Sequence, residues 1–313
     1  MKTSPSSMVK LTRRYLAHRR SFGGRLQGAD YDLRAFARFL DHTAPGEPLS
    51  TKLALQWLKV EPCQPATIAV RLSTIRGFAR FCATLDARTH TPATHLFPRR
   101  AGRRAPHIFT DTQLRLLLRR TQRLRPWRNE LRPLVYRTLI ALLACSGMRP
   151  SEAIRLRAGD FNATTGTLRV PAVKRGLERT LPLHPSTVLA LQRYQRIRRS
   201  HYPCASHFLV GPFGRPWQMC AADWTFRQLV RGIPSNGSRP GPRLYDLRHR
   251  FATQWIARWS RQSVPLAHRL VLLSRYRGHR CFHDTYWYVQ PESAALKTAA
   301  TRFERYHRQP PAT

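Results

Sequence analysis

The segment LVYRTLIALLACSG, residues 134–147, constrains the fold of this chain more than any other stretch. It is apolar almost throughout, whereas a helix at a protein surface carries a single apolar stripe. A helix of this composition must be enclosed by other elements. We predict a buried core helix that ends at Gly147, because glycine readily adopts the left-handed conformation that closes a helix.

Helical and strand-like patterns follow this segment. Pro150 and Ser151 suit a helix start. The runs GTLRVPAV (166–173) and RTLPLHP (179–185) are strand-like and are joined by KRGLE, so we predict a hairpin with Lys174 at its tip. Helical periodicity returns after Pro185, in STVLALQRYQRI, DWTFRQLV and YDLRHRFATQWIARW. The expected fold class is mainly α with a small β-sheet (α+β).

The N-terminal third predicts a separate set of amphipathic helices. In YDLRAFARFLDH, the residues Leu33, Phe36, Phe39 and Leu40 share one face. Ser50 can cap the following helix, TKLALQWLKV. Residues 65–85 repeat apolar side chains in steps of three or four, at Ile68, Leu72, Ile75, Phe78, Cys82 and Leu85.

A stretch without periodicity separates the two parts. DARTHTPATHLFPRRAGRRAPHIF, residues 86–109, contains three prolines and the basic run RRAGRR, which is typical of a linker. A helix then begins in TDTQLRLLLRR, with Thr110 as its cap and Gln113 at the capping-box position. We predict a helical domain over residues 1–104, with the linker from about residue 86, and a second domain over residues 105–313.

The charge of the chain indicates a polyanionic partner. Lys and Arg number 55 against 16 Asp and Glu, which gives a net charge of +39. Each phosphate contact releases counterions and favours binding, so we expect a nucleic acid as partner. A purely RNA-binding protein is one alternative. In the helix of residues 65–85, Arg71, Arg76 and Arg80 lie off the apolar stripe and form either a solvated face or a set of DNA contacts.

Signatures of other protein classes are missing from the sequence. No apolar run approaches the roughly 20 residues that span a bilayer. The N-terminus has no apolar secretory segment, so we expect a cytoplasmic protein without membrane contact. No C-x-x-C occurs, and the pairs in CASH (204–207) and CFH (281–283) have no second pair at ligand spacing. We therefore expect no metal, no cofactor and no disulfide among the six cysteines, which are Cys63, Cys82, Cys145, Cys204, Cys220 and Cys281.

Four motifs resemble those of a known family. They are CSGMRPSEAIRL with Arg149 and Glu152, PAVKRGLERTLPL with Lys174, RLYDLRHRFAT with Tyr245 and Arg248, and YRGHRCFHDTYWY with His279 and Tyr288. Their order and spacing closely resemble the tyrosine recombinase (phage integrase) family. The resemblance covers the whole second domain, and the first is similar to the family's core-binding domain. DTYWY followed by RFERY resembles integrases of bacterial mobile elements in particular.

The resemblance implies site-specific DNA integration and recombination through a 3′-phosphotyrosyl intermediate, without metal or ATP. Such chemistry needs a nucleophile, cations for the developing phosphate charge and an acid for the leaving oxygen. Arg149 and Arg248 would grip the phosphate, because a guanidinium fork matches its oxygens and stays charged. Lys174 would protonate the leaving 5′ oxygen, and His279 would hydrogen-bond the phosphate or assist the proton of the nucleophile.

Three further residues take supporting roles in this interpretation. Glu152 would orient Arg149 or the neighbouring base, and a plain surface salt bridge is the alternative. Arg175 and Arg179 lie near Lys174 in the sequence, and we expect both to contact DNA.

Tyr245 departs from the family's usual pattern, which has histidine three residues before the second arginine. A tyrosine keeps a donor hydroxyl, but its unperturbed pKa near 10 makes it a poor general base. The departure leaves the rate and the proton route open. It also favours one alternative, a DNA-binding integrase relative without catalysis.

Two tyrosines, Tyr286 and Tyr288, compete for the role of nucleophile. On a helix they lie about 200° apart, so only one can face the phosphate. Thr285 followed by a tyrosine at the third position matches the family, as does the spacing from Gly278 and His279. We therefore predict that Tyr288 is the nucleophile.

The C-terminal tail indicates assembly. PESAALKTAATRFERY, residues 291–306, is amphipathic, with Leu296 and Phe303 as possible anchors. In this family such a tail often docks on a neighbouring protomer, which implies a homotetramer on double-stranded DNA and a monomer or weak oligomer when free. A tail that packs on its own domain is one alternative for this segment. For the activity, a type IB-like topoisomerase is another.

Overall fold

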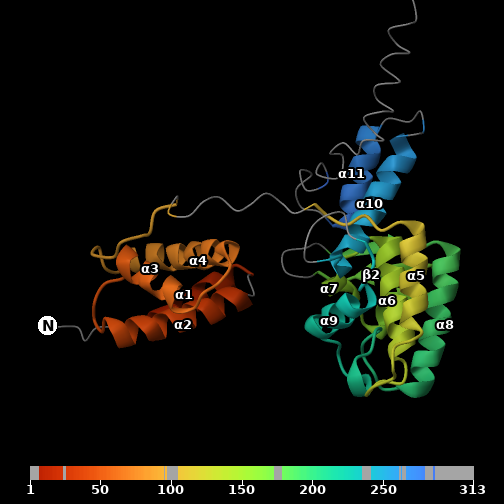
Figure 1. Ribbon diagram of the computed structural model, residues 1–313, viewed down its shortest axis with the longest axis horizontal. Coiled ribbons are helices and arrows are strands. Elements are labelled where there is room, and N and C mark those ends of the chain that lie inside the picture. Colours follow the sequence, from red (N-terminus) through yellow and green to blue (C-terminus); the bar gives the residue numbers. More distant parts are fainter. Residues whose placement is uncertain are drawn as a thin grey trace, which may run out of the picture. The chain divides into compact units, whose positions relative to one another are not determined.

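The computed structural model describes residues 7–23, 26–94, 96, 105–172, 178–234, 241–260, 262, 266–278 and 285. The chain divides into two compact units, Met1–Arg104 and Ala105–Thr313 (Figure 1). We predicted a boundary near residue 105. The roles predicted for the two units, DNA binding and catalysis, rest on the resemblance and not on this division.

The first unit is a bundle of helices. Helix α2 packs against α1, α3 and α4, and α4 also packs against α1 and α3. The predicted face of α2 points into this bundle, because Leu33, Phe36 and Leu40 are fully buried. Ser50 accepts a hydrogen bond from the Leu53 amide at 3.3 Å, which confirms the predicted cap. The helices are α1 (Met8–Ser21), α2 (Gln27–Thr43), α3 (Thr51–Val60) and α4 (Pro65–Ala83).

The predicted stripe of α4 is correct over most of its length. Leu72, Ile75, Phe78 and Cys82 are buried against the bundle. The assignment of Leu85 to this stripe is wrong, because the helix ends at Ala83 and Leu85 is exposed. The Leu85 amide bonds the Cys82 carbonyl in the turn that follows, so the helical direction is already lost there.

The first residues of the predicted linker are held to the first unit. The His90 amide donates to the Leu49 carbonyl at 2.8 Å. Arg76 of α4 donates to the carbonyls of Pro92 and Ala93, both at 3.0 Å. Hydrogen bonds to the backbone therefore hold His90, Pro92 and Ala93 in place, although this segment has no periodicity.

Helix α6 lies at the centre of the second unit, where α5, α8 and α10 pack against it (Figure 1). Most residues of α6 from Val135 to Ser146 are buried, and only a narrow stripe of Arg137, Ala141 and Cys145 is exposed, which agrees with the predicted core helix. Helix α9 packs on α5, and α11 packs on α10. The helices of this unit are α5 (Asp111–Thr121), α6 (Arg132–Ser146), α7 (Pro150–Ala153), α8 (Pro185–His201), α9 (Met219–Leu229), α10 (Leu244–Ser260) and α11 (Leu266–Arg277), with 3-10 turns η1 (Ala158–Asp160) and η2 (Pro212–Gly214).

The second unit also holds a small antiparallel sheet of order β1-β2-β3, which has the strands β1 (Phe161–Asn162), β2 (Thr167–Val170) and β3 (Arg179–Pro182). The pairing of β2 with β3 confirms the predicted hairpin, and its register sets Leu168 opposite Leu181, both buried. The strand β1 was not predicted. The expected fold class, mainly α with a small β-sheet, is confirmed.

One further local feature agrees with the sequence. Thr110 and Gln113 exchange both hydrogen bonds of a capping box at 3.1 Å, at the start of α5. Within the described part of the chain, no helix has both the length and the apolar character that crossing a bilayer requires.

The turn after α6 brings this central helix against α10. Gly147 ends α6 in the left-handed region, with φ of +60°. A Cβ atom at Gly147 would overlap the ring of Phe251 on α10. Glycine is therefore needed at this position for its backbone conformation and also for the close approach of the two helices. This contact places the backbone beyond α6 next to the first turns of α10.

Candidate active site

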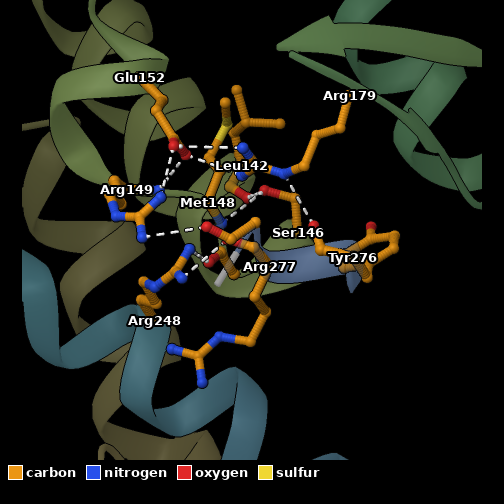
Figure 2. Close-up of polar contacts among 11 residues, drawn as sticks. Leu142, Ser146, Met148, Arg149, Glu152, Arg179, Arg248, Tyr276 and Arg277 are labelled. Carbon is orange, nitrogen blue, oxygen red and sulfur yellow. Dashed lines mark hydrogen bonds and ion pairs between the residues drawn. The ribbon is translucent and has the colours of Figure 1, made fainter. Parts of the chain in front are cut away.

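A single arginine joins two backbone segments of the second unit (Figure 2). Arg248, on α10, donates from Nη1 to the Gly147 carbonyl at 2.6 Å. From Nη2 it donates to the Arg277 carbonyl at 2.9 Å. Arg248 therefore ties the turn after α6 to the end of α11, which leads directly into Gly278 and His279.

The guanidinium of Arg248 is a buried cation. The residue has no exposed surface, its two hydrogen-bond acceptors among the described residues are neutral carbonyls, and its Nε has no hydrogen-bond partner among those residues. Burial, followed by the positive charges of Arg277 and Arg149, lowers the pKa of Arg248 to about 9. The group still carries its proton at neutral pH. A desolvated cation without a carboxylate partner is a strong binding point for an anion.

Arg149 is the second cation, and Glu152 fixes it. Arg149 caps the short helix α7. Its amide donates to Glu152 Oε2 at 2.8 Å, and its Nη1 donates to Oε1 at 2.9 Å. Nη2 reaches the Gly278 carbonyl at 3.3 Å. The side chain of Arg149 is 31% exposed, so it is held in place yet still open to a ligand.

Arg179 is the second arginine that binds the Glu152 carboxylate. Its Nη1 and Nη2 donate to Oε1 and Oε2 of Glu152 at 3.2 and 2.8 Å. Its Nε donates to the Tyr276 carbonyl at 2.8 Å. Burial alone would raise the pKa of Glu152, but hydrogen bonds and charge from Arg179, and then the hydrogen bonds from Arg149, lower it to about 2. We predicted a DNA contact for Arg179. The structure instead directs its guanidinium inward.

Tyr245 lies in the first turn of α10, and its side chain is partly exposed. Its ring packs edge-to-face on the ring of the buried His249, with 5.2 Å between their centroids. Asp246 fixes this turn, because it accepts from the Arg243 amide at 2.8 Å and from the Arg243 side chain at 3.0 Å. The same turn thus carries Tyr245 on the outside and Arg248 toward the site.

Four of the predicted site residues, and the competing Tyr286, lie outside the described residues. Among the neighbours of the predicted nucleophile, Thr285 is described, and it is helical and fully buried. The structure therefore brings together Arg149, Glu152 and Arg248. The roles predicted for Lys174, Arg175, His279 and Tyr288 stay predictions.

The three arginines of α4 that we predicted as DNA contacts differ in their surroundings. Arg71 forms ion pairs with Glu61 at 3.0 Å and Asp32 at 3.4 Å, and lies over the Trp57 ring. Arg76 bonds the backbone carbonyls noted above, whereas Arg80 is exposed. Arg80 and Arg76 also line, with Arg19 of α1, a cavity of about 320 Å³. The charge of Arg71 is already balanced, while that of Arg80 faces solvent.

The sequence patterns missed Arg277. This arginine is fully buried at the end of α11, and its positive charge contributes to the lowered pKa of Arg248. Its position directly before Gly278 in the RGH motif was the available signal, but a chain with 55 Lys and Arg offers many such arginines. Within the described residues, no group of three or more His, Cys, Asp or Glu side chains could hold a metal ion.

Comparison with known proteins agrees with these motifs. Residues 108–292 match the model of the phage integrase family. The putative integrase/recombinase y4rB of Sinorhizobium fredii is 33% identical over 311 residues, which cover 96% of this chain and 98% of that protein. Tyrosine recombinase XerD of Xanthomonas campestris is 31% identical over 172 residues, which cover 54% of this chain and 51% of that protein.

The fold is also found among solved structures. The integrase of transposon Tn1549, solved with a circular intermediate DNA, has a TM-score of 0.67 at 16% identity and covers 96% of this chain and 99% of its own. Since the family model spans the arginine cluster and a relative matches along almost the whole chain, this protein belongs to the phage integrase family.

Proposed function

We propose that this protein is a site-specific DNA recombinase that cuts and rejoins strands through a covalent link to Tyr288. The Tyr288 hydroxyl oxygen attacks the phosphorus, the bond from phosphorus to the 5′ oxygen breaks, and a 3′-phosphotyrosyl enzyme results. The 5′ oxygen of another duplex then attacks this link and releases the tyrosine. Each step exchanges one phosphoester bond for another, so the reaction consumes no ATP.

The observation that carries this proposal is the buried cation of Arg248 beside Arg149. The two side-chain hydrogen bonds of Arg248 in the described structure go to backbone carbonyls, and Arg149 is oriented by a buried carboxylate. Two fixed guanidinium groups suit a phosphate that gains negative charge in its transition state. Preorganised cations of this kind stabilise the transition state without having to reorganise during the reaction.

Proton transfer completes the proposed mechanism. Lys174 gives a proton to the leaving 5′ oxygen, and His279 takes part in removing the proton of Tyr288 or bonds the phosphate. Tyr245 lies three residues before Arg248 and supplies a hydroxyl donor, not a base. We propose that its hydroxyl assists in binding the phosphate.

Access to the site belongs to the proposal as well. Arg248 has no exposed surface in the protein without DNA. A phosphate can reach this guanidinium only if DNA binding uncovers it. Cleavage is thereby coupled to binding of the duplex, which would protect the cell's other phosphodiesters from unguided attack.

The proposed partner is double-stranded DNA, bound by both units of the chain. On DNA the active form is a homotetramer, in which the tail of residues 291–306 docks on a neighbouring protomer. The relatives named integrase or recombinase and the net charge of +39 support this assignment. We place its action in the bacterial cytoplasm, where the DNA lies.

Covalent trapping tests the proposed function. The full chain is incubated with duplex that spans the junctions of the element carrying its gene, nicked beside the candidate phosphate so that the cleaved piece diffuses away. A denaturing gel then shows protein joined to DNA. We expect an adduct from the wild-type protein and from Tyr286→Phe, and none from Tyr288→Phe.

Other results would assign another function. An adduct lost only in Tyr286→Phe would move the nucleophile. No adduct on DNA that is demonstrably bound would favour the DNA-binding relative without catalysis, and Tyr245→His would then be the first variant to test for restored activity. Relaxation of a supercoiled plasmid without any junction would favour the topoisomerase.

A further inference from the structure

Arg179 occupies an unexpected place for a residue of a hairpin strand in so basic a protein. It lies at the start of β3, yet its side chain is only 10% exposed and reaches α7 and α11 (Figure 2). Each of its three guanidinium nitrogens donates to an oxygen of these neighbours, two to Glu152 and one to the Tyr276 carbonyl.

We propose that Arg179 is a positioning residue for DNA cleavage, which acts through Glu152 on Arg149 and through the Tyr276 carbonyl on the turn that precedes His279. This inference rests on the function proposed above. It replaces the DNA contact that the sequence suggested for this residue.

The first part of the argument is the saturation of Glu152. The carboxylate is 2% exposed, and it accepts four hydrogen bonds, two from Arg149 and two from Arg179. The fork of Arg179 holds both oxygens, so the carboxylate cannot rotate about its own axis. The oxygens that bind the amide and Nη1 of Arg149 are thereby fixed in direction, and Arg149 with them.

The second part is the contact with Gly278. A Cβ atom at this glycine would lie 2.8 Å from Nη1 and 3.0 Å from Cζ of Arg179. Gly278 has φ of +65°, a conformation that glycine adopts without strain. The missing side chain thus makes room for the guanidinium. Arg179 therefore packs against the turn at Gly278. The Gly278 carbonyl in the same turn accepts a hydrogen bond from Arg149.

A neighbouring pair shows that this arrangement is not forced by the sheet. Arg169 on β2 also pairs with a buried carboxylate, Asp160, at 2.7 Å. The side chain of Arg169 is nevertheless 56% exposed. The Asp160 carboxylate also accepts a hydrogen bond from the Arg157 amide, at the start of η1. Arg169 therefore provides a matched control, because it has the same chemistry on the adjacent strand but no contact with the arginine cluster among the described residues.

The ionisation of Glu152 makes the effect of removing Arg179 depend on pH. This dependence distinguishes a positioning role from a general loss of stability. The charged groups that face Glu152 are Arg179 of β3 and Arg149, the residue before α7, and Arg248 of α10 also interacts with its charge. Burial raises the pKa of Glu152, and Arg179 and then Arg149 lower it. Wild-type Glu152 therefore stays ionised at any working pH. Without Arg179 its pKa rises, and the carboxylate is lost as the pH falls.

The test compares Arg179→Gln, Arg179→Lys and Arg169→Gln in the full chain. The rate of adduct formation on the nicked junction duplex is measured at saturating protein from about pH 8 to about pH 5, a range in which an unsupported buried carboxyl titrates. DNA affinity is measured separately against salt concentration. We expect Arg179→Gln to form adduct about 10- to 100-fold more slowly, as for other supporting partners of a site.

The shape of the pH profile decides the interpretation. The ratio of the Arg179→Gln rate to the wild-type rate should fall as pH decreases, with DNA affinity unchanged. Arg179→Lys should restore the flat ratio because it keeps the charge, but only part of the rate because it lacks the fork. Arg169→Gln should match wild type in both rate and profile.

Three outcomes would overturn the inference. A wild-type rate in Arg179→Gln would show that the contact is dispensable. A slower rate with a constant ratio at every pH, shared by Arg169→Gln, would indicate general destabilisation. Weaker DNA binding with a smaller salt dependence would restore the DNA-contact role. Absence of any adduct from the wild-type protein on bound DNA would instead overturn the proposed function, and this inference with it.

Discussion

Arg71 in the first unit and Arg248 in the second show two opposite uses of the same side chain. Arg71 is paired with two carboxylates at the edge of a helix bundle and packs over a tryptophan ring. Arg248 is fully buried and donates to carbonyl oxygens, and no carboxylate contact to it is found among the described residues. Sequence alone gave both of them a role at DNA.

This contrast shows that burial and pairing, and not charge alone, decide what an arginine does. An arginine balanced by carboxylates stabilises its own surroundings and adds little attraction for a phosphate. An exposed arginine such as Arg80 adds salt-dependent affinity. A buried arginine held by neutral carbonyls keeps its capacity to bind an anion, and it keeps one geometry, which is what a transition state requires.

Substitution of Arg248 is expected to have the largest effect on adduct formation. Arg248→Lys loses the fork that joins the Gly147 and Arg277 carbonyls, so we expect adduct formation to fall about 10²- to 10³-fold, the usual cost of one lost donor in a preorganised site. Arg250→Lys is the control, because Arg250 is also buried on α10 but pairs with Asp111 and the Phe109 carbonyl. Equal losses in both variants would show that α10 was simply destabilised.

The second largest effect is expected at Gly147, whose carbonyl accepts a hydrogen bond from Arg248. Gly147→Ala adds a Cβ at φ of +60° against the Phe251 ring. The left-handed conformation alone costs about 1–2 kcal/mol for a residue with a side chain, and the Tm of a unit of this size falls by about 2–4 °C for each kcal/mol lost. Calorimetry of Gly147→Ala should therefore show a clear decrease in Tm.

Gly159→Ala is the matched comparison for that measurement. Gly159 has no positive φ, and a Cβ there would meet nothing within 4 Å. Its Tm should stay close to that of the wild-type protein. A decrease in Tm as large as that of Gly147→Ala would contradict the claim that position 147 specifically requires glycine.

The smallest effect distinguishes two arginines of α4. Arg80→Ala should weaken binding to DNA by a few-fold and reduce the slope of log affinity against log salt by about 1, as expected for one lost phosphate contact. Arg71→Ala should leave the slope unchanged, because Glu61 and Asp32 already balance its charge. Titration of the full chain against a random-sequence duplex at several salt concentrations measures both. A reduced slope for Arg71→Ala would contradict the contrast drawn above.

Much of the fold could be predicted because local chemistry determines it. The caps at Ser50 and Thr110, the all-apolar helix before Gly147 and the alternation in the hairpin each depend on residues close together in the chain. The short β1 could not be predicted, since two residues carry no period and pair only because β2 lies alongside. The end of α4 was placed too late, because the apolar spacing continued beyond the helix.

The sequence by itself determined which family this chain belongs to and which motifs build its site, because order and spacing are properties of the chain. Only the tertiary structure decided where each arginine points. Arg179 reaches inward because the strand pairing and the space at Gly278 direct it to Glu152, and those partners lie 27 residues away or more along the chain. Among 55 Lys and Arg, charge alone cannot make that distinction.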